Sequence, residues 1–461
     1  MKARPYTTRY ALAALAAALA MPSLAPAEPL REVVSGFAAD DDQPSVRASL
    51  DYGFDVDTAA IRRERAGLDG ADPDGPMPLA KDLRHRKLRH ELVPRIDLGV
   101  FRDLSISAAM PVVVYDSSRL SFDQRSKPCV FPGDGGTPTC IDENNSTTVQ
   151  DGLLPADGYD ARNPGGAGFT SPGDATLFRG PQRQGIDQLH LGVTWAAMSQ
   201  RRDRFAPTWA IGGEARLAIG KPMRLDRSDP RAETGVGRGV HEIRLWSSME
   251  KRTRWALPYV MFWWQAPLGT RADSQFIEPG FGQTRVAPQQ RAGTRFGFET
   301  ALWEEPERER GVDLRMHGSL EAFFEGRAYS EMWEVFQYAG DPTYDGPLVL
   351  DADPVQPGRQ ALAHPGVSNV QNHLELGGGV SLGARLGGGL RLDAGFDLRH
   401  RQAHALSFAA AGVDRDGSGV IEAGTDEVNP LYAPTIDQTG HRYRSHGGLT
   451  YATTLRLATS F

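Results

Sequence analysis

The chain has 461 residues, a formal net charge of −7 and two cysteines. Its acidic balance argues against a nucleic acid as partner, because phosphate backbones are recognised by basic surfaces. The mean hydropathy of −0.41 does not exclude a membrane protein. A strand of a membrane barrel shows hydrocarbon only at every second residue, so a hydropathy average hides it. A transmembrane helix needs about 18 consecutive apolar residues, and no segment after residue 27 has them.

The N-terminal segment has the pattern of a secretory signal peptide. Lys2, Arg4 and Arg9 come before a short apolar run at 11–20, and residues 25–27 form a cleavage motif of the A-x-A type. A membrane-anchoring helix is the alternative, but it needs roughly 20 apolar residues. We expect residues 1–27 to be removed and residues 28–44 to form a short periplasmic segment.

From residue 45 onward, apolar and polar residues alternate in segments that are typical of half-buried β-strands. In the first segment Val46, Leu50 and Phe54 share one parity, while charged or small residues occupy the other. The pattern indicates an all-β chain. Twelve strands are predicted, at 46–57, 88–100, 104–114, 186–198, 208–220, 239–249, 254–266, 291–303, 311–329, 373–386, 390–399 and 449–461.

Short and long connections alternate along this series of strands. An up-and-down antiparallel barrel in a membrane requires such a pattern, with short periplasmic turns, long extracellular loops and an even number of strands. A further hairpin near 342–351 would give fourteen strands. The loop at 115–185 contains both cysteines, and an exported chain meets an oxidising compartment. We therefore predict a Cys129–Cys140 disulfide, with two free thiols as the alternative.

The last predicted strand carries the most specific resemblance. Leu449, Tyr451, Leu455 and Leu457 share one parity, and the chain ends on Phe461. This strand resembles the closing strand of Gram-negative outer-membrane β-barrels, although Thr459 replaces the hydrophobic residue that is usual there. The resemblance implies a transmembrane barrel over 45–461 in the outer membrane, surrounded by lipid. It also implies that the barrel-assembly machinery reads the terminal aromatic residue.

Aromatic residues near the predicted strand ends fit lipid–water interfaces. Trp195, Trp209 and Trp255 lie beside short turns and share the parity of the apolar positions. We expect Tyr259 and Trp263 to continue the lipid face of the seventh strand. Trp303 has the opposite parity, which indicates a β-bulge or an inward position.

Charged residues of both signs occupy the strand positions of opposite parity, and we expect these residues to face the lumen. Each charge there must be solvated by water or paired with an opposite charge. One interpretation is a porin-like channel for passive diffusion of small polar or amphipathic solutes. The alternative is a closed barrel, filled by paired charges, that acts as a structural or surface-interaction scaffold. No G-x-S-x-G motif and no outward Ser–His pair indicates an enzyme, and no cofactor is required. The predicted lumen-lining residues are Arg47, Asp51, Arg95, Asp97, Arg216, Arg244, Glu299, Arg315, Glu321, Arg391, Asp393 and Asp397.

One segment in the loop at 400–440 resembles an EF-hand calcium loop. Asp414, Asp416 and Ser418 occupy the first, third and fifth positions, and a glycine occupies the sixth. Val420 would offer its carbonyl and Glu422 would occupy the ninth position. Position twelve is threonine, so Asp426 or Glu427 would have to replace the usual glutamate. The loop is therefore either a structural Ca²⁺ site or an acidic, glycine-rich turn.

Overall fold

The structure is a computed structural model that describes residues 45–65, 77–101, 103–125, 140–166, 168–169, 175–200 and 202–460. The predicted signal peptide, the segment at 28–44, Cys129 and Phe461 lie outside these residues. The signal peptide, the disulfide and the recognition of Phe461 by the assembly machinery therefore stay predictions.

Twelve antiparallel strands pair in chain order and close into a barrel, which confirms the predicted fold class. Closure joins β1 to the last strand, β21, with Tyr52 opposite Leu455. The third strand is interrupted between β3 and β4, and the fourth is preceded by β7. The barrel strands are β1 (Ser45–Glu64), β2 (Leu79–Phe101), β3 (Leu104–Ala109), β4 (Val112–Phe122), β7 (Arg183–Ile186), β8 (Gln188–Met198), β9 (Thr208–Ala218), β10 (Val240–Glu250), β11 (Leu257–Thr270), β12 (Arg291–Glu305), β13 (Arg310–Phe323), β18 (His373–Gly387), β19 (Leu390–Arg401) and β21 (Tyr443–Ser460).

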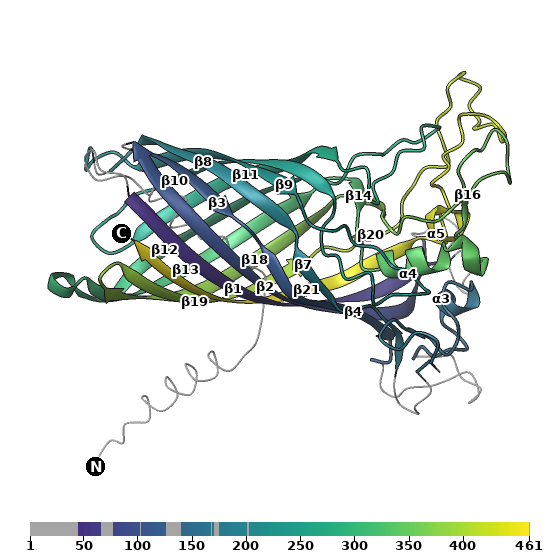
Figure 1. The fold of residues 1–461 in the computed structure, drawn as a ribbon, viewed down its shortest axis with the longest axis horizontal. Coiled ribbons are helices and arrows are strands. Elements are labelled where there is room, and N and C mark those ends of the chain that lie inside the picture. The colour runs from purple at the N-terminus through teal and green to yellow at the C-terminus, as the bar shows by residue number, and fades with distance from the viewer. Residues whose placement is uncertain are drawn as a thin grey trace, which may run out of the picture.

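The two ends of the barrel differ (Figure 1). Short turns and the C-terminal end of β21 lie at one end, and the short helices and small sheets gather beyond the other. No helix in the described part of the chain is long and apolar enough to cross a membrane. The loop elements are α3 (Thr147–Gln150), β5 (Tyr159–Asp160), β6 (Thr176–Arg179), β14 (Gly326–Ala328), α4 (Trp333–Ala339), η3 (Pro342–Tyr344), β15 (Leu350–Asp351), β16 (Ala361–Leu362), β17 (Ser368–Val370), β20 (His404–Ala405) and α5 (Pro434–Asp437), and η2 (Pro306–Arg308) forms a short turn.

The fourteen-strand alternative is wrong for the region that suggested it. Residues 342–351 form η3 and β15, and β15 pairs with β16 in a separate two-stranded sheet. The predicted strand at 311–329 is also too long. β13 ends at Phe323, and β14 leaves the barrel to pair with β17.

The outward face of the barrel is apolar. Leu50, Ile96, Leu191, Phe262 and Leu455 are among the large apolar side chains that remain exposed on it. A soluble monomer rarely exposes a continuous apolar surface, whereas a membrane barrel must do so. Polar and charged residues of the same strands point inward, so the two parities face hydrocarbon and lumen as expected.

Two predictions about aromatic residues have different outcomes. Tyr259 is only 8% exposed and Trp263 lies on the same inward parity, so their predicted lipid-facing positions are wrong. Both parities of β11 are apolar, and Phe262 and Trp264 are the outward residues. Trp303 is 50% exposed and follows a register shift after Ala301, which confirms a bulge.

Candidate functional site

The extracellular end of the barrel contains a hydrophobic core of its own. Inward side chains from the strand ends, such as Ile61, Leu83 and Phe122, pack with Val335 and Phe336 of α4. We call the loop elements that carry this core (α3, β6, α4, β15 and α5) the cap. Because a helix that is buried on nearly every side must be surrounded by protein, α4 lies inside the cap rather than on its surface.

The segment that leads into α4 spans the mouth of the barrel, held at one side by Arg401. The guanidinium of Arg401 contacts Glu331 at 2.8 Å, Asp57 of β1 at 2.6 Å and Glu375 of β18 at 3.4 Å. The Ser445 hydroxyl donates to the same Glu331 carboxylate at 2.9 Å. These contacts tie the segment before α4 to four consecutive strands of the wall, β18, β19, β21 and β1.

A second buried ion pair holds the other side of this segment. Arg183 of β7 contacts Glu334 at 2.8 Å, and its guanidinium lies over the ring of Trp333 at 4.8 Å. The Ser118 hydroxyl donates to Glu334 as well. We call the pairs Glu331–Arg401 and Glu334–Arg183 the latch. Since β7 and β19 are five strands apart around the barrel, the latch bridges the mouth from wall to wall.

Burial and charge act in opposite directions on Glu331. Burial alone would raise the pKa of this carboxyl, but the Arg401 guanidinium, the His404 and His85 side chains and a backbone hydrogen bond together lower the pKa to about 2. The latch carboxylate is therefore charged at neutral pH. A buried charge of this kind is tolerated because its partner is fixed, and loss of either partner would leave the other uncompensated.

A cavity of about 570 Å³ lies in the lumen beneath the cap. Nine basic and eight acidic side chains line it, so the wall carries both signs in nearly equal number. Five of the predicted lumen residues are among them: Asp51, Arg95, Arg216, Arg244 and Glu321. Asp57, Glu375 and Arg401 also line this cavity, so it reaches the Arg401 side of the latch.

The other predicted lumen residues lie mainly in ion pairs along the barrel wall. Asp97 contacts Arg95 at 2.8 Å, and Glu299 contacts Arg315 at 3.3 Å. Arg47 lies opposite Asp97 in the β1–β2 register. These contacts join side chains of the inward face, so they strengthen the wall and reduce the free charge of the lumen.

A second group of these residues centres on Arg391. Its guanidinium contacts Asp313 at 2.7 Å and Asp393 at 2.6 Å. Asp397 contacts His317 at 2.6 Å. The predicted charges therefore divide between the cavity and a paired network on the wall below it.

An aromatic cluster occupies part of the lumen near the periplasmic end. Trp246, Tyr259 and Met261 pack with small residues of β8 and β9, and Trp263 packs against them. The Arg244 guanidinium lies 4.3 Å from the ring of Trp263. Trp246 and Met261 also line the cavity, so its wall includes apolar as well as charged surface.

The sequence did not reveal the latch. The first and second strands were expected to end at residue 57 and to start at residue 88, whereas β1 reaches Glu64 and β2 begins at Leu79. Lys87 and Arg401 continue the inward parity beyond the predicted strand ends, and this extension was the available signal. Glu331 and Glu334 had no such signal, because their positions depend on contacts far away in the sequence.

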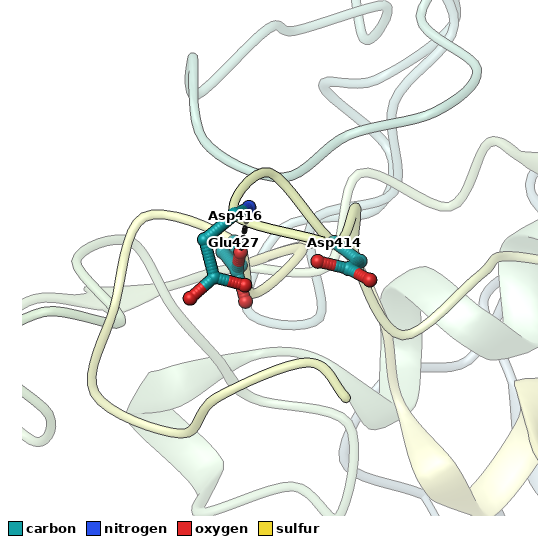
Figure 2. A group of neighbouring side chains, drawn as sticks. All are labelled: Asp414, Asp416 and Glu427. Atoms are coloured by element: carbon teal, nitrogen blue, oxygen red, sulfur yellow. Dashed lines mark hydrogen bonds between the residues drawn. The ribbon is translucent and has the colours of Figure 1, made fainter. Parts of the chain in front are cut away.

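The calcium-like loop brings some of its predicted ligands together (Figure 2). Carboxylate oxygens of Asp414, Asp416 and Glu427 lie within 4.8 Å of one another. Glu427 accepts a hydrogen bond from the backbone N–H of Asp416 at 3.3 Å, and Asp414 accepts one from Gly417 at 2.7 Å. Asp426 and Glu427 were the two acids that could replace the usual glutamate at position twelve, and Glu427 is the one that lies beside Asp414 and Asp416.

The remaining predicted ligands lie outside this carboxylate group. The Ser418 hydroxyl donates to the carbonyl of Val420 at 3.0 Å, and Glu422 is exposed. Asp426 instead contacts the Arg415 guanidinium at 2.5 Å. Backbone N–H groups account for the arrangement without a metal, so calcium binding stays a prediction.

Only one of the two cysteines lies in the described part of the chain. Cys140 is completely buried, next to the cap core that includes Ile141. Cys129 lies outside the described residues. The disulfide therefore remains a prediction for the loop at 115–185.

No protein-family profile matches the sequence, and no protein of curated function does. Among solved structures, an outer membrane channel from Pseudomonas putida F1 is 7% identical, with 95% of this chain and 100% of that chain covered and a TM-score of 0.38. A Pseudomonas aeruginosa FadL homologue is 9% identical, with 91% and 90% covered and a TM-score of 0.30. The outer membrane protease OmpT from Escherichia coli is 8% identical, with 90% and 97% covered and a TM-score of 0.27.

These scores are too low to carry an argument about function. The assignment rests instead on the closed strand pairing, the apolar outward face and the charged interior. The chain is therefore a β-barrel of the outer-membrane type. Lipid therefore surrounds the barrel, and the short turns face the periplasm.

Proposed function

We propose that this barrel is a gated channel for small polar or amphipathic solutes. The observation that carries the proposal is the charged cavity beneath a cap that the two ion pairs of the latch tie across the mouth. A barrel that served purely as a scaffold has no need for a polar cavity of this volume in its interior. The latch gives passage a point of control, because opening requires the segment around α4 to leave the mouth.

The lining of the cavity favours solutes that carry polar or charged groups of both signs. Arginines and carboxylates alternate on its wall, so neither a strongly anionic nor a strongly cationic solute is favoured throughout. Trp246 and Met261 add an apolar surface on which the hydrocarbon or ring of an amphipathic solute can rest. The cavity volume of about 570 Å³ suits a solute of small-molecule size.

The alternative is the closed barrel that acts through its extracellular loops. It is supported by the hydrophobic core of the cap and by the ion pairs that fill part of the lumen. In this case the cap would be a permanent part of the fold and no condition would open the lumen. No catalytic role is proposed.

Solute entry into proteoliposomes separates the two functions. Refolded wild-type protein and Glu331→Gln would be compared in liposome swelling with neutral, zwitterionic and charged solutes of increasing size. Glu325→Gln is the matched control, since Glu325 pairs with Arg285 in an exposed ion pair of the same loop. We expect slow swelling with the wild type and the control, and several-fold faster swelling with Glu331→Gln. If no variant admits any solute, the scaffold is the correct function.

We also propose that the loop at 414–427 binds Ca²⁺ and so stiffens the extracellular surface. Three converging carboxylates are the hard oxygen ligands that this ion prefers. Calorimetric titration with Ca²⁺ should give one site in the wild type and none in Asp416→Asn. Asp426→Asn, which alters only the exposed pair with Arg415, should bind as the wild type does. Equal binding by both variants would remove the site from this loop.

A further inference from the structure

Four arginines gather on the outward face of the barrel near its extracellular end. They line a pocket of about 410 Å³, and their positions are Arg86 in β2, Arg119 in β4, Arg162 just after β5 and Arg179 in β6. Leu88, Tyr115 and Ser117 line the same pocket. Arg86 shares its parity with the exposed Ile96 and Leu98, so this pocket opens outside the barrel and not into the lumen.

The strand register places these positive charges directly beside one another. Arg86 lies opposite Arg119 in the β2–β4 pair, and Arg119 lies opposite Arg179 in the β4–β6 pair. Like charges at directly opposed positions destabilise a sheet. A row of three arginines across three strands is therefore a place where a bound anion would lower the repulsion between like charges.

Two of the four arginines have no carboxylate partner among the described residues. Arg179 pairs with Asp160 at 2.8 Å, but among the described residues no carboxylate forms a salt bridge with Arg86 or Arg162. Arg162 donates to the Tyr115 hydroxyl at 3.2 Å and to the Ser117 hydroxyl. Its Nε is buried without a partner in the structure. The guanidinium of Arg162 is thus held in place at the pocket by the two hydroxyls.

The pocket lies at the edge of the apolar band. On β2 the outward residues are apolar from Val100 up to Leu92, and His90 then joins an aromatic group. His90 stacks on Phe54 at 4.3 Å and meets Tyr115 edge-on at 5.6 Å. Aromatic groups of this kind mark a lipid–water interface, and a strand crosses the hydrocarbon in about 9–11 residues. Arg86 comes one outward position after Leu88, at the level of the outer-leaflet headgroups.

We propose that Arg86, Arg119, Arg162 and Arg179 bind the phosphate groups of lipopolysaccharide, the anionic glycolipid of the outer leaflet. Guanidinium groups bind phosphate oxygens through paired N–H donors, which makes arginine suited to this ligand. The acyl chains would run down the apolar wall below the pocket, beside Leu88 and Val56. The inference concerns the outer face and does not depend on the lumen or on solute passage.

The test is a binding titration on the refolded full-length mature protein in detergent. The probes are diphosphoryl lipid A, the same lipid A after removal of both phosphates, and inorganic phosphate. The variant is Arg86→Gln with Arg119→Gln. The control is Arg254→Gln with Arg308→Gln, which removes the same charge from exposed periplasmic turns. A gel shift between unheated and heated samples verifies that each barrel is folded.

We expect the wild type and the control to bind diphosphoryl lipid A at least about tenfold more tightly than the dephosphorylated lipid. The double variant should lose this preference, and Arg86→Gln alone should weaken it if the double variant fails to fold. Equal affinity for the two lipids in the wild type would overturn the proposal. So would an equal loss in the control, or full displacement of the lipid by inorganic phosphate at micromolar concentration.

Discussion

At the scale of single residues, Arg401 connects the barrel to the cap. Its guanidinium meets Asp57, Glu331 and Glu375, which come from β1, the loop before α4, and β18. Such a hub is costly to desolvate, and it is stable only while the guanidinium and the carboxylates stay together. The same property makes it a point at which the cap can be released, because one protonation or substitution leaves Arg401 with fewer partners.

Acidification should release the cap through Glu331. Its pKa is about 2 in the folded protein and 4.5 in an ordinary glutamate. A depressed carboxyl pKa contributes stability that is fully present above pH 4.5 and is lost as the pH falls toward 2. Limited proteolysis of the extracellular loops should therefore accelerate over this range in the wild type. In Glu331→Gln the cap should already be weakened at pH 7 by about 1.5–3 kcal/mol, and this part of the pH dependence should be missing.

Glu325→Gln serves as the control for this pH series. Its ion pair with Arg285 is exposed, so removal should cost less than about 1 kcal/mol. An identical pH response in Glu331→Gln and in the wild type would show that Glu331 does not hold the cap.

At the scale of elements, the lumen is shaped by large side chains that lie flat against inward glycines. A Cβ on Gly212 of β9 would lie 2.1 Å from the ring of Trp246 on the neighbouring strand. Glycine therefore leaves the room in which the indole rests on the wall instead of extending across the lumen. Trp263 lies against Gly293 in the same manner, since a Cβ on this glycine would come within 2.7 Å of the indole.

Gly212→Ala should push Trp246 away from the wall. We expect a loss of about 1–3 kcal/mol in unfolding free energy, as for overpacking in general, and a change in tryptophan emission. Urea unfolding followed by the gel shift between folded and unfolded barrel measures the first effect. Gly269→Ala is the control, since a Cβ at this position would meet no heavy atom within 4 Å. Equal stability of the two variants would contradict this packing.

The sequence predicts a strand well where one face is apolar and meets lipid while the other face is polar. The membrane-crossing part of β1 alternates between Leu50 or Phe54 and Asp51 or Asp55, and its period identifies it without a structure. Above the membrane the inward positions of the same strand hold apolar residues such as Ile61, which packs in the cap core. The pattern of polar inward and apolar outward residues is therefore lost there. In β11 both faces are apolar, and the period cannot distinguish Tyr259 from Phe262.

Of the candidate site, only the charged residues on the barrel wall could be predicted from the sequence. Residues such as Arg95 and Arg244 follow from strand parity, because parity is a local property of the chain. The latch brings Glu334 next to Arg183, which is 151 residues away. No local pattern encodes a contact of this kind. The four arginines of the outward pocket likewise become neighbours only through the register of β2, β4 and β6.

At the scale of the whole molecule, one surface meets hydrocarbon and the other meets polar groups. The strands carry this division across the membrane, and closure through β1 and β21 leaves no open edge in the bilayer. The cap adds a third environment, a small hydrophobic core outside the membrane. The barrel can therefore stay intact while the cap moves, because the two are held by different interactions.

A charge placed on the lipid face should cost far more than the same charge in the lumen. Leu455→Arg puts a guanidinium on an exposed apolar position of β21, for which we expect a loss of about 2–4 kcal/mol. Thr450→Arg on the same strand points into the charged cavity and should cost less. Chemical unfolding in lipid bilayers measures both variants. A larger loss for Thr450→Arg would mean that the two faces have been exchanged.

Single-channel recording in planar bilayers tests the gated lumen most directly. Wild-type protein, Glu331→Gln, Glu334→Gln and the control Glu325→Gln would be recorded under identical salt and voltage. We predict rare or brief openings in the wild type and the control, and frequent steps of one common size in both latch variants. Silence in all four proteins, or identical openings in all four, would contradict a charged passage closed by the latch.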